Sequence, residues 1–356
     1  MNSNIRLHGE NLGVFRYARI GSKTLSRELR VGLIGLGMMG RNHLRVLRSL
    51  SGVKLIGVVD PVVQNDSNDL SGLVCADLDA LIKRGMDYCV VAVPTSNHLE
   101  VGLSLAAAGV HALIEKPIAH DTKSGNVLVA SFEKAGLIAG IGHIERFNAA
   151  VQQARLRIAA GDLGDVFSIS TRRLGPFPAR IKDVGVVTDL ATHDIDLTMW
   201  ISQAKYQHIS AFTNHRSERA YEDFVSFVSQ LDNGMIATNQ VNWLTPFKKR
   251  EVLITGDTGS FLIDTLSADL TFYENGQFQT QWSEIANFRG VTEGNVIRFA
   301  FPKPEPLVTE HESFRDAVLG KPTKFVTLRE GLAVLSVAEA VLESAKTKRT
   351  IEMPNS

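Results

Sequence analysis

A glycine-rich turn between a short apolar segment and a helix constrains this 356-residue chain more than any other feature. Residues 35–40 read Gly-Leu-Gly-Met-Met-Gly, a full GxGxxG motif. The first glycine permits a tight turn, the second lets the backbone approach a pyrophosphate, and the third allows a helix to pack closely on a strand. The N-terminus of that helix also favours negative charge. We therefore predict a dinucleotide-binding turn made by Gly35, Gly37, Met38, Met39 and Gly40.

Asp60 indicates which dinucleotide this turn binds. It ends the next apolar segment, about twenty residues after Gly40, where a carboxylate can accept hydrogen bonds from the adenine-ribose hydroxyls. The same carboxylate would repel the 2′-phosphate of NADP, and Pro61-Val62-Val63 brings no cation to offset that repulsion. The sequence therefore favours NAD over NADP.

The hydrophobic pattern predicts an α/β fold in two domains. Between residues 30 and 147, short apolar segments alternate with helical ones, which is typical of a doubly wound parallel sheet covered on both faces, a Rossmann domain. Residues 148–327 read as an α+β domain with a largely antiparallel open sheet, because Asp232-Asn233-Gly234 is a hairpin turn. Residues 328–346 have helical spacing, and we expect this helix to pack back onto the first domain. The expected parallel strands are 30–34, 53–59, 88–93, 111–114 and 137–141.

Composition and charge exclude several classes of partner. Hydrophobic residues make up 44% and charged residues 21% of the chain, as in an ordinary globular protein. Lys and Arg number 38, as do Asp and Glu, so charge balance gives no reason to expect nucleic acid or a membrane surface. Cys75 and Cys89 belong to no metal-binding spacing. We expect a cytoplasmic protein with no metal site, in which residues 1–29 form an N-terminal extension or, alternatively, an organelle transit peptide.

Three further segments stand where parallel strands should end, the edge at which such sheets bind ligands. They are residues 93–98 (Val-Pro-Thr-Ser-Asn-His), residues 115–117 (Glu-Lys-Pro) and a helix expected at 187–201 that carries Asp189 and His193. In this order, and with GxGxxG, they resemble the glucose–fructose oxidoreductase/inositol dehydrogenase (Gfo/Idh/MocA) family from about residue 30 to the C-terminus. The segment from Asp189 to His193 departs from the family pattern by lacking its usual glycine, which leaves the Asp/His pair intact.

The resemblance implies an NAD-dependent oxidoreductase of sugars. Besides the glycine turn and Asp60, it implies that further residues bind the nicotinamide half of NAD. These are Val93, Pro94, Thr95, His98, Glu115 and Lys116. Lys116 would also be the catalytic lysine, and Asp189 with His193 would complete the site.

Alcohol oxidation needs a proton acceptor near the reacting oxygen as well as a hydride acceptor. His193 titrates near neutrality and suits proton transfer. Lys116 can stabilise negative charge on the oxygen, or serve as the base itself beside a positive nicotinamide. Asp189, one helical turn earlier than His193, can orient the imidazole or contact a neighbouring hydroxyl. The choice of base between Lys116 and His193 stays open.

The basic segment 171–184 bears on the substrate. Arg172, Arg173 and Arg180 can clamp a pyrophosphate by bidentate hydrogen bonds, or belong to a solvated loop. Asp196 is either a second substrate contact or a surface charge, and His143 with Arg146 is expected at the domain junction. Residues 172–200 resemble the UDP-N-acetylglucosamine 3-dehydrogenase branch of the family. That resemblance implies oxidation of a nucleotide sugar at its 3-hydroxyl and an aminotransferase as a pathway neighbour.

Other functions remain compatible with the sequence. Within the same chemistry, the substrate could be a free sugar, an inositol or a nucleoside. A glycosidase of this fold would use NAD transiently and release no net NADH. An NAD-sensing regulator has no need of the Lys116/His193 pair, so this pair favours an enzyme. The open sheet face predicts that copies of the chain associate, and the resemblance implies a homodimer or homotetramer.

Overall fold

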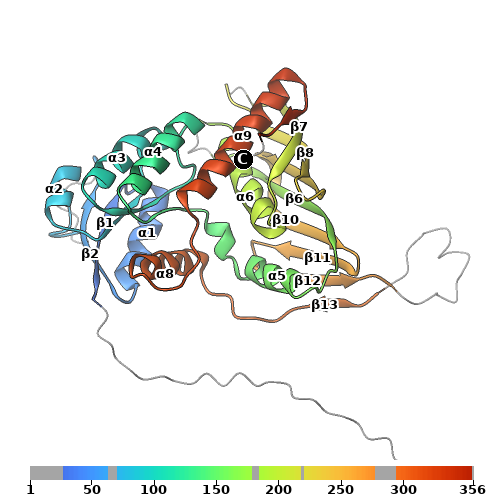
Figure 1. The fold of residues 1–356 in the computed structure, drawn as a ribbon, viewed down its shortest axis with the longest axis horizontal. Coiled ribbons are helices and arrows are strands. Elements are labelled where there is room, and N and C mark those ends of the chain that lie inside the picture. The colour runs from blue at the N-terminus through green and yellow to red at the C-terminus, as the bar shows by residue number, and fades with distance from the viewer. Residues whose placement is uncertain (1–26, 63–69, 179–183, 218–219, 277–293, 355–356) are drawn as a thin grey trace, which may run out of the picture.

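The computed structural model describes residues 27–62, 70–178, 184–217, 220–276 and 294–354 (Figure 1). It contains a five-stranded sheet and a nine-stranded sheet, each with its own helices. Most of the expected N-terminal extension and the predicted substrate residue Arg180 lie outside the described residues. Within the described residues, no helix is long and apolar enough to cross a membrane.

The first sheet is parallel throughout, with the order β2-β1-β3-β4-β5, which confirms the predicted Rossmann-type arrangement. The direction of strand order changes between β1 and β3, which is where doubly wound sheets bind ligands. The third and fifth strands are shorter than expected. The third, β3, ends at Val91, before Pro94 and the 3-10 turn that follows it, and the fifth, β5, begins only at Ala139. The strands are β1 Leu29–Ile34, β2 Val53–Val59, β3 Tyr88–Val91, β4 His111–Ile114 and β5 Ala139–Ile141.

Alternating side chains bury both faces of this sheet. Val31 and Leu33 enter one core with residues of α1 and α8, whereas Ile34 enters another with residues of α2, α3 and α4. This is the pattern of a strand covered on both sides. The helices and 3-10 turns of this half are α1 Met38–Ser49, α2 Leu78–Lys83, η1 Thr95–Asn97, α3 His98–Ala107, α4 Thr122–Lys134, η2 Ile144–Phe147 and α8 Pro306–Val318.

The second sheet has the order β13-β12-β11-β10-β6-β9-β8-β7-β14. Its pairs are antiparallel except β6 with β9, so the prediction of a largely antiparallel sheet is confirmed. The predicted hairpin joins β8 and β9. The strands are β6 Val166–Pro176, β7 Tyr206–Asn214, β8 Phe224–Leu231, β9 Ile236–Asn242, β10 Leu244–Gly256, β11 Gly259–Asp264, β12 Asp269–Glu274, β13 Val296–Arg298 and β14 Ile351–Glu352.

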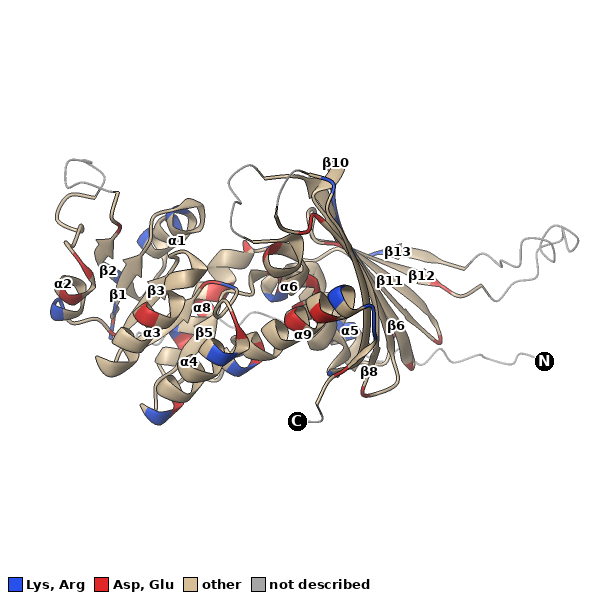
Figure 2. Cartoon of the chain, turned by 90° about the horizontal axis from the view of Figure 1, so that it is seen from above, with Lys and Arg blue, Asp and Glu red and all other residues tan. Residues whose placement is uncertain are grey.

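Helices lie on one face of this second sheet, which we call the covered face (Figure 2). They are α5 Ala149–Ala159, α6 Thr192–Ser202 and α9 Leu328–Thr347. The opposite face, which we call the open face, carries no helix in Figure 2. Helix α9 contacts α4 and β5 of the first half as well as β7 and α6 of the second, so it joins the two sheets.

Candidate active site

The three glycines of the turn after β1 fill three different steric roles. Gly35 has φ +91°, and a Cβ there would lie 2.5 Å from the Ala92 carbonyl oxygen. A Cβ at Gly40 would lie 1.9 Å from the Gly35 carbonyl oxygen, so helix α1 can approach β1 only because this position is glycine. A Cβ at Gly37 would meet nothing within 4 Å. Space therefore remains beside Gly37 for a pyrophosphate, as the motif requires.

The surroundings of this turn fit a dinucleotide. No side chain caps the N-terminus of α1, so its amide groups remain available to an anion. Met38 is largely exposed and Met39 half-buried just after the turn. Asp60, at the end of β2, accepts hydrogen bonds from the Leu36 amide at 2.6 Å and the Val62 amide at 2.9 Å. Its carboxylate is thus fixed beside the glycine turn, where an adenine ribose would lie.

The structure brings Lys116 and Asp189 together. Lys116 directly follows β4 and Glu115, and its Nζ donates to the Asp189 carbonyl oxygen at 2.7 Å and to Asp189 Oδ1 at 3.2 Å. Both side chains are largely buried, at 15% and 11% exposure. Because an ammonium has three N–H groups, one remains for a substrate oxygen. Asp189 Oδ2 is buried and has no partner among the described residues.

A π-helical turn replaces the first part of the helix expected at residues 187–201. Val187–Ala191 is π-helical, and α6 begins only at Thr192. Such turns are rare and frequent at functional sites. The carbonyl oxygen that binds Lys116 Nζ belongs to this turn, so the local departure from α geometry coincides with the Lys116–Asp189 contact. The prediction of a helix over residues 187–201 is confirmed, and its first turn is π-helical rather than α-helical.

His193 lies beside a second histidine, His143, with ring centroids 6.5 Å apart and planes at 87°. Burial and the positive charges of Lys116 and Arg173 hold the pKa of His193 well below its ordinary value. His193 is therefore neutral at physiological pH and able to accept a proton. Nδ1 of each ring has no partner within the described residues.

His98 connects two of the predicted loops around the nicotinamide. Its Nδ1 lies 2.9 Å from the Pro117 carbonyl oxygen and its Nε2 lies 3.1 Å from the Val93 carbonyl oxygen. The ring is 1% exposed, and burial lowers its pKa. His98 thus fixes the loop after β3, with Pro94 and Thr95, against the loop after β4, which carries Lys116.

Glu115 belongs to a buried polar network beneath the site. Its Oε1 lies 2.8 Å from His43 Nε2 of α1, and His43 Nδ1 lies 2.8 Å from His311 Nε2 of α8. Burial alone would raise the pKa of Glu115, but the hydrogen bond and charge of His43 outweigh it and lower that pKa. A Cβ at Gly142 would lie 3.2 Å from the Glu115 carboxylate, so this glycine makes room for it.

The predicted substrate arginines do not come together. Arg173 is 4% exposed and is bound by Asp194 and Glu145, both at 2.8 Å, so its charge is neutralised within the protein. Arg172 is exposed and, as the next residue of β6, points to the open face, away from α6 and His193. The structure therefore argues against Arg172 and Arg173 as substrate contacts in the same chain.

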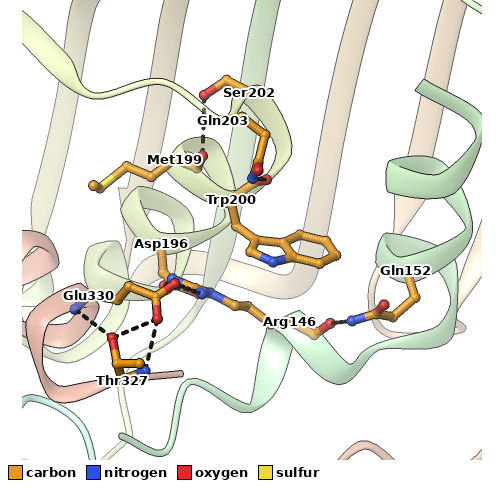
Figure 3. A network of polar contacts seen from close by, with 9 residues as sticks. All are labelled: Arg146, Gln152, Asp196, Met199, Trp200, Ser202, Gln203, Thr327 and Glu330. Carbon is orange, nitrogen blue, oxygen red and sulfur yellow. Dashed lines mark hydrogen bonds and ion pairs between the residues drawn. The ribbon is translucent and has the colours of Figure 1, made fainter. Parts of the chain in front are cut away.

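Asp196 is fully buried in a network centred on Arg146 (Figure 3). Arg146 Nε contacts both Asp196 oxygens at 2.9 Å, and its Nη1 contacts Glu330 Oε1 at 2.5 Å. Thr327 in turn donates to Glu330, which closes the N-terminus of α9. This places Asp196 as a support that joins η2, α6 and α9, rather than as a surface charge.

Two profile comparisons identify the family. The profile described as an oxidoreductase family with an NAD-binding Rossmann fold matches residues 29–143, and that of the GFO/IDH/MocA C-terminal domain matches residues 151–262. The chain belongs to the Gfo/Idh/MocA family. The predictions of an oxidoreductase and of NAD as its cofactor are thereby confirmed.

Relatives of this Gfo/Idh/MocA oxidoreductase include dehydrogenases named for different substrates. The UDP-N-acetylglucosamine 3-dehydrogenase of Acidithiobacillus ferrooxidans is 29% identical over 87% of this chain and 95% of its own length. Its structure has a TM-score of 0.79, with 90% of this chain and 98% of that one covered at 27% identity. The scyllo-inositol 2-dehydrogenase (NAD(+)) of Bacillus subtilis is 25% identical over 92% of this chain and 97% of its length. GenD2 from gentamicin A biosynthesis, solved with NAD, has a TM-score of 0.77 at 25% identity, covering 92% of this chain and 97% of that one.

Sequence reasoning missed several residues of this Gfo/Idh/MocA site. His43 lies on the buried face of an amphipathic helix, a polar residue at an apolar position, and that pattern could have marked it. Asp194 and Arg250 carried no such signal. Arg250 comes to the site only through the pairing of β10 with β6.

Proposed function

We propose that this chain oxidises a secondary hydroxyl group of a sugar, and that its substrate is a nucleotide sugar oxidised at C3, such as UDP-N-acetylglucosamine. The observation that carries the proposal is the contact of Lys116 with Asp189, close enough to His193 for the charge of Lys116 to lower the pKa of His193. The relative named for this reaction is matched over nearly its whole length, which supports the choice of substrate. An inositol is the second candidate, because an inositol dehydrogenase is matched over a similar share.

The proposed reaction breaks the O–H bond of the alcohol and the C–H bond at the same carbon, and forms a ketone. NAD⁺, when bound, accepts the hydride. Gly37, the N-terminus of α1 and Asp60 would hold its pyrophosphate and adenine ribose. Lys116 Nζ donates its third N–H to the reacting oxygen and stabilises the negative charge that develops there.

We assign the role of base to His193. A neutral imidazole can accept the hydroxyl proton, whereas the Lys116 ammonium already donates to Asp189 and has no free lone pair. The positive groups that lower the pKa of His193 also make it release that proton readily afterwards. Asp189 positions Lys116 through its carboxylate and its carbonyl oxygen.

The test measures NADH formation by the full chain with NAD⁺ and a panel of alcohols. The panel contains UDP-N-acetylglucosamine, UDP-glucose, glucose, myo-inositol and nucleosides, with a ketone trap to pull the equilibrium forward. We expect NADH from the UDP-sugar, with kcat lowered about 10²- to 10⁴-fold in Lys116→Ala and His193→Ala. Lys123→Ala, an exposed lysine on α4, is the matched control and should retain full activity.

Each other outcome points to a specific alternative. Turnover of a free polyol alone would keep the dehydrogenase and reject the nucleotide sugar. Sugar release without net NADH would indicate a glycosidase, and tight NAD binding without any turnover would indicate a sensor. Loss of activity in Lys123→Ala as well would mean that the variants report on folding rather than on chemistry.

The cellular setting follows from the same proposal. A ketone at C3 of an amino sugar is the substrate that an aminotransferase converts to an amine, so an aminotransferase is the proposed pathway partner. Cys75 and Cys89 are both free and buried, which suits a reducing cytoplasm. We also propose that copies of the chain associate through the open face of the second sheet.

A further inference from the structure

Arg250 lies on β10, directly opposite Arg173 of the neighbouring strand β6. Strand alternation places it on the same face as Val252 and Ile254, which are both buried against the helices. Arg250 therefore points to the covered face, toward α6 and His193, unlike Glu251, which pairs with Arg172 on the open face. Its half-buried guanidinium lies against the backbone of β6, where a Cβ on Gly175 would come within 3.7 Å of it.

Arg173 and Arg250 differ in their counter-ions. Arg173 is bound by Asp194 and Glu145. Nη1 of Arg250 donates to two carbonyl oxygens, those of Leu174 and Lys249. Within the described residues, Arg250 forms no ion pair, and its Nε and Nη2 groups donate to no protein atom. Two adjacent N–H groups of a planar fork thus remain without a partner.

A half-buried guanidinium has lost part of its hydration, so negative charge and hydrogen-bond acceptors beside it are stabilising. Burial and the neighbouring Arg173 lower the pKa of Arg250, and the negative charges of Asp194, Glu145 and Asp189 offset this only in part. An anionic ligand would supply the missing charge. The remaining Nε–H and Nη2–H groups match two oxygens of a phosphate.

We propose that Arg250 binds the phosphate group of the substrate on the covered face of the second sheet, beside His193. This assignment rests on the proposed function, and it specifies that the substrate is an anion rather than a neutral polyol. In a sugar that carries a phosphate on C1 and is oxidised at C3, one ring carbon, C2, lies between C1 and the reacting carbon. Arg250 and the Lys116/His193 pair would hold these two ends, which fixes which hydroxyl faces NAD.

The test compares Arg250→Gln and Arg250→Lys with wild type, and uses Arg172→Gln as the matched control. The control removes one positive charge from the opposite face of the same sheet. With UDP-N-acetylglucosamine and saturating NAD⁺, we expect KM to rise about 10- to 100-fold in Arg250→Gln, the effect of losing hydrogen bonds to a charged group. Arg250→Lys keeps the charge but loses the fork, so its KM should be intermediate. Arg172→Gln should keep the wild-type KM, and NAD affinity should be unchanged in all three variants.

Inorganic pyrophosphate serves as a probe that does not depend on turnover. It should compete with the substrate for the wild-type holoenzyme and bind at least about tenfold more weakly to Arg250→Gln. Turnover of UDP-N-acetylglucosamine with an unchanged KM in Arg250→Gln would reject the role of Arg250 and leave the proposed function standing. Turnover of a sugar phosphate without a nucleotide, but not of a UDP-sugar, with a raised KM in Arg250→Gln would support Arg250 and reject the nucleotide sugar. Turnover of neutral polyols alone, with no pyrophosphate inhibition, would reject both.

Discussion

Glu310, on α8, illustrates how burial sets the state of a single carboxyl group. It is 2% exposed, and neither of its oxygens has a partner among the described residues. Burial and the nearby carboxylates of Glu115 and Asp196 raise its pKa well above the ordinary value. Glu310 is therefore neutral in the folded protein at pH values where it would be ionised in the unfolded chain.

This state predicts a pH-dependent gain in stability for Glu310→Gln. Above the unfolded pKa of about 4.5, the unfolded chain releases a proton that the folded chain keeps, so wild-type stability falls as pH rises toward the folded pKa. The slope is at most about 1.4 kcal/mol per pH unit. Glu310→Gln lacks this proton, so its Tm should exceed that of wild type more at about pH 8 than at about pH 5.

Glu312→Gln is the matched control, because Glu312 is exposed on the same helix. Thermal unfolding of both variants at the two pH values gives the comparison. An equal Tm difference at both values for Glu310→Gln would mean that Glu310 is ionised when folded, contrary to the prediction.

At the scale of an element, helix α1 depends on the order of the three glycines before it. A Cβ at Gly40 would strike the backbone of Gly35, which cannot move without displacing the helix from the sheet. A Cβ at Gly37 would enter open space instead. Substitution by alanine should therefore affect a different property at each position: the stability of the fold at Gly40 and the binding of NAD at Gly37.

We predict that Gly40→Ala lowers the stability of the NAD-free protein by about 1–3 kcal/mol, as overpacking does. Gly37→Ala should leave that stability unchanged but weaken NAD binding about tenfold or more, because its methyl group occupies space that the pyrophosphate needs. Denaturant unfolding and a fluorescence titration with NAD measure the two effects. Wild-type stability in Gly40→Ala, or wild-type NAD affinity in Gly37→Ala, would contradict this division.

At the scale of the whole molecule, the open face of the second sheet carries large apolar side chains in water. They come from four different strands, and the alternation of buried and exposed residues places them on the face that no helix covers in Figure 2. Large exposed apolar surfaces of this kind commonly mark interfaces between protein chains. They include Phe212, Val228, Ile236 and Leu253, which are 71%, 51%, 41% and 39% exposed.

We predict that the wild-type chain forms a dimer or tetramer and that the double variant Val228→Lys/Leu253→Lys is a monomer. Charges at both positions would make burial of this face unfavourable. Light scattering after size-exclusion chromatography measures the mass. Leu156→Lys, at a leucine on α5 that is 62% exposed, should keep the wild-type assembly. A monomeric wild type would reject the interface.

The parallel strands, the hairpin and the glycine turn could be predicted because their signals are local. Apolar runs, turn residues and the spacing from Gly40 to Asp60 are properties of neighbouring residues. The order of the motifs likewise indicated the family, its cofactor and the trio of Lys116, Asp189 and His193.

Only the tertiary structure decided on which face of the second sheet each cation lies. Arg172 and Arg173 are neighbours in sequence, yet one points to the open face and the other is neutralised by Asp194 and Glu145. We propose Arg250 for the role of substrate contact, and it reaches the covered face because β10 pairs with β6 in one particular register. Register and strand partners depend on contacts between distant segments, and a shift by one residue would reverse every side chain. The sequence by itself therefore determined the chemistry of the site, and the pairing of the strands determined which charges surround it.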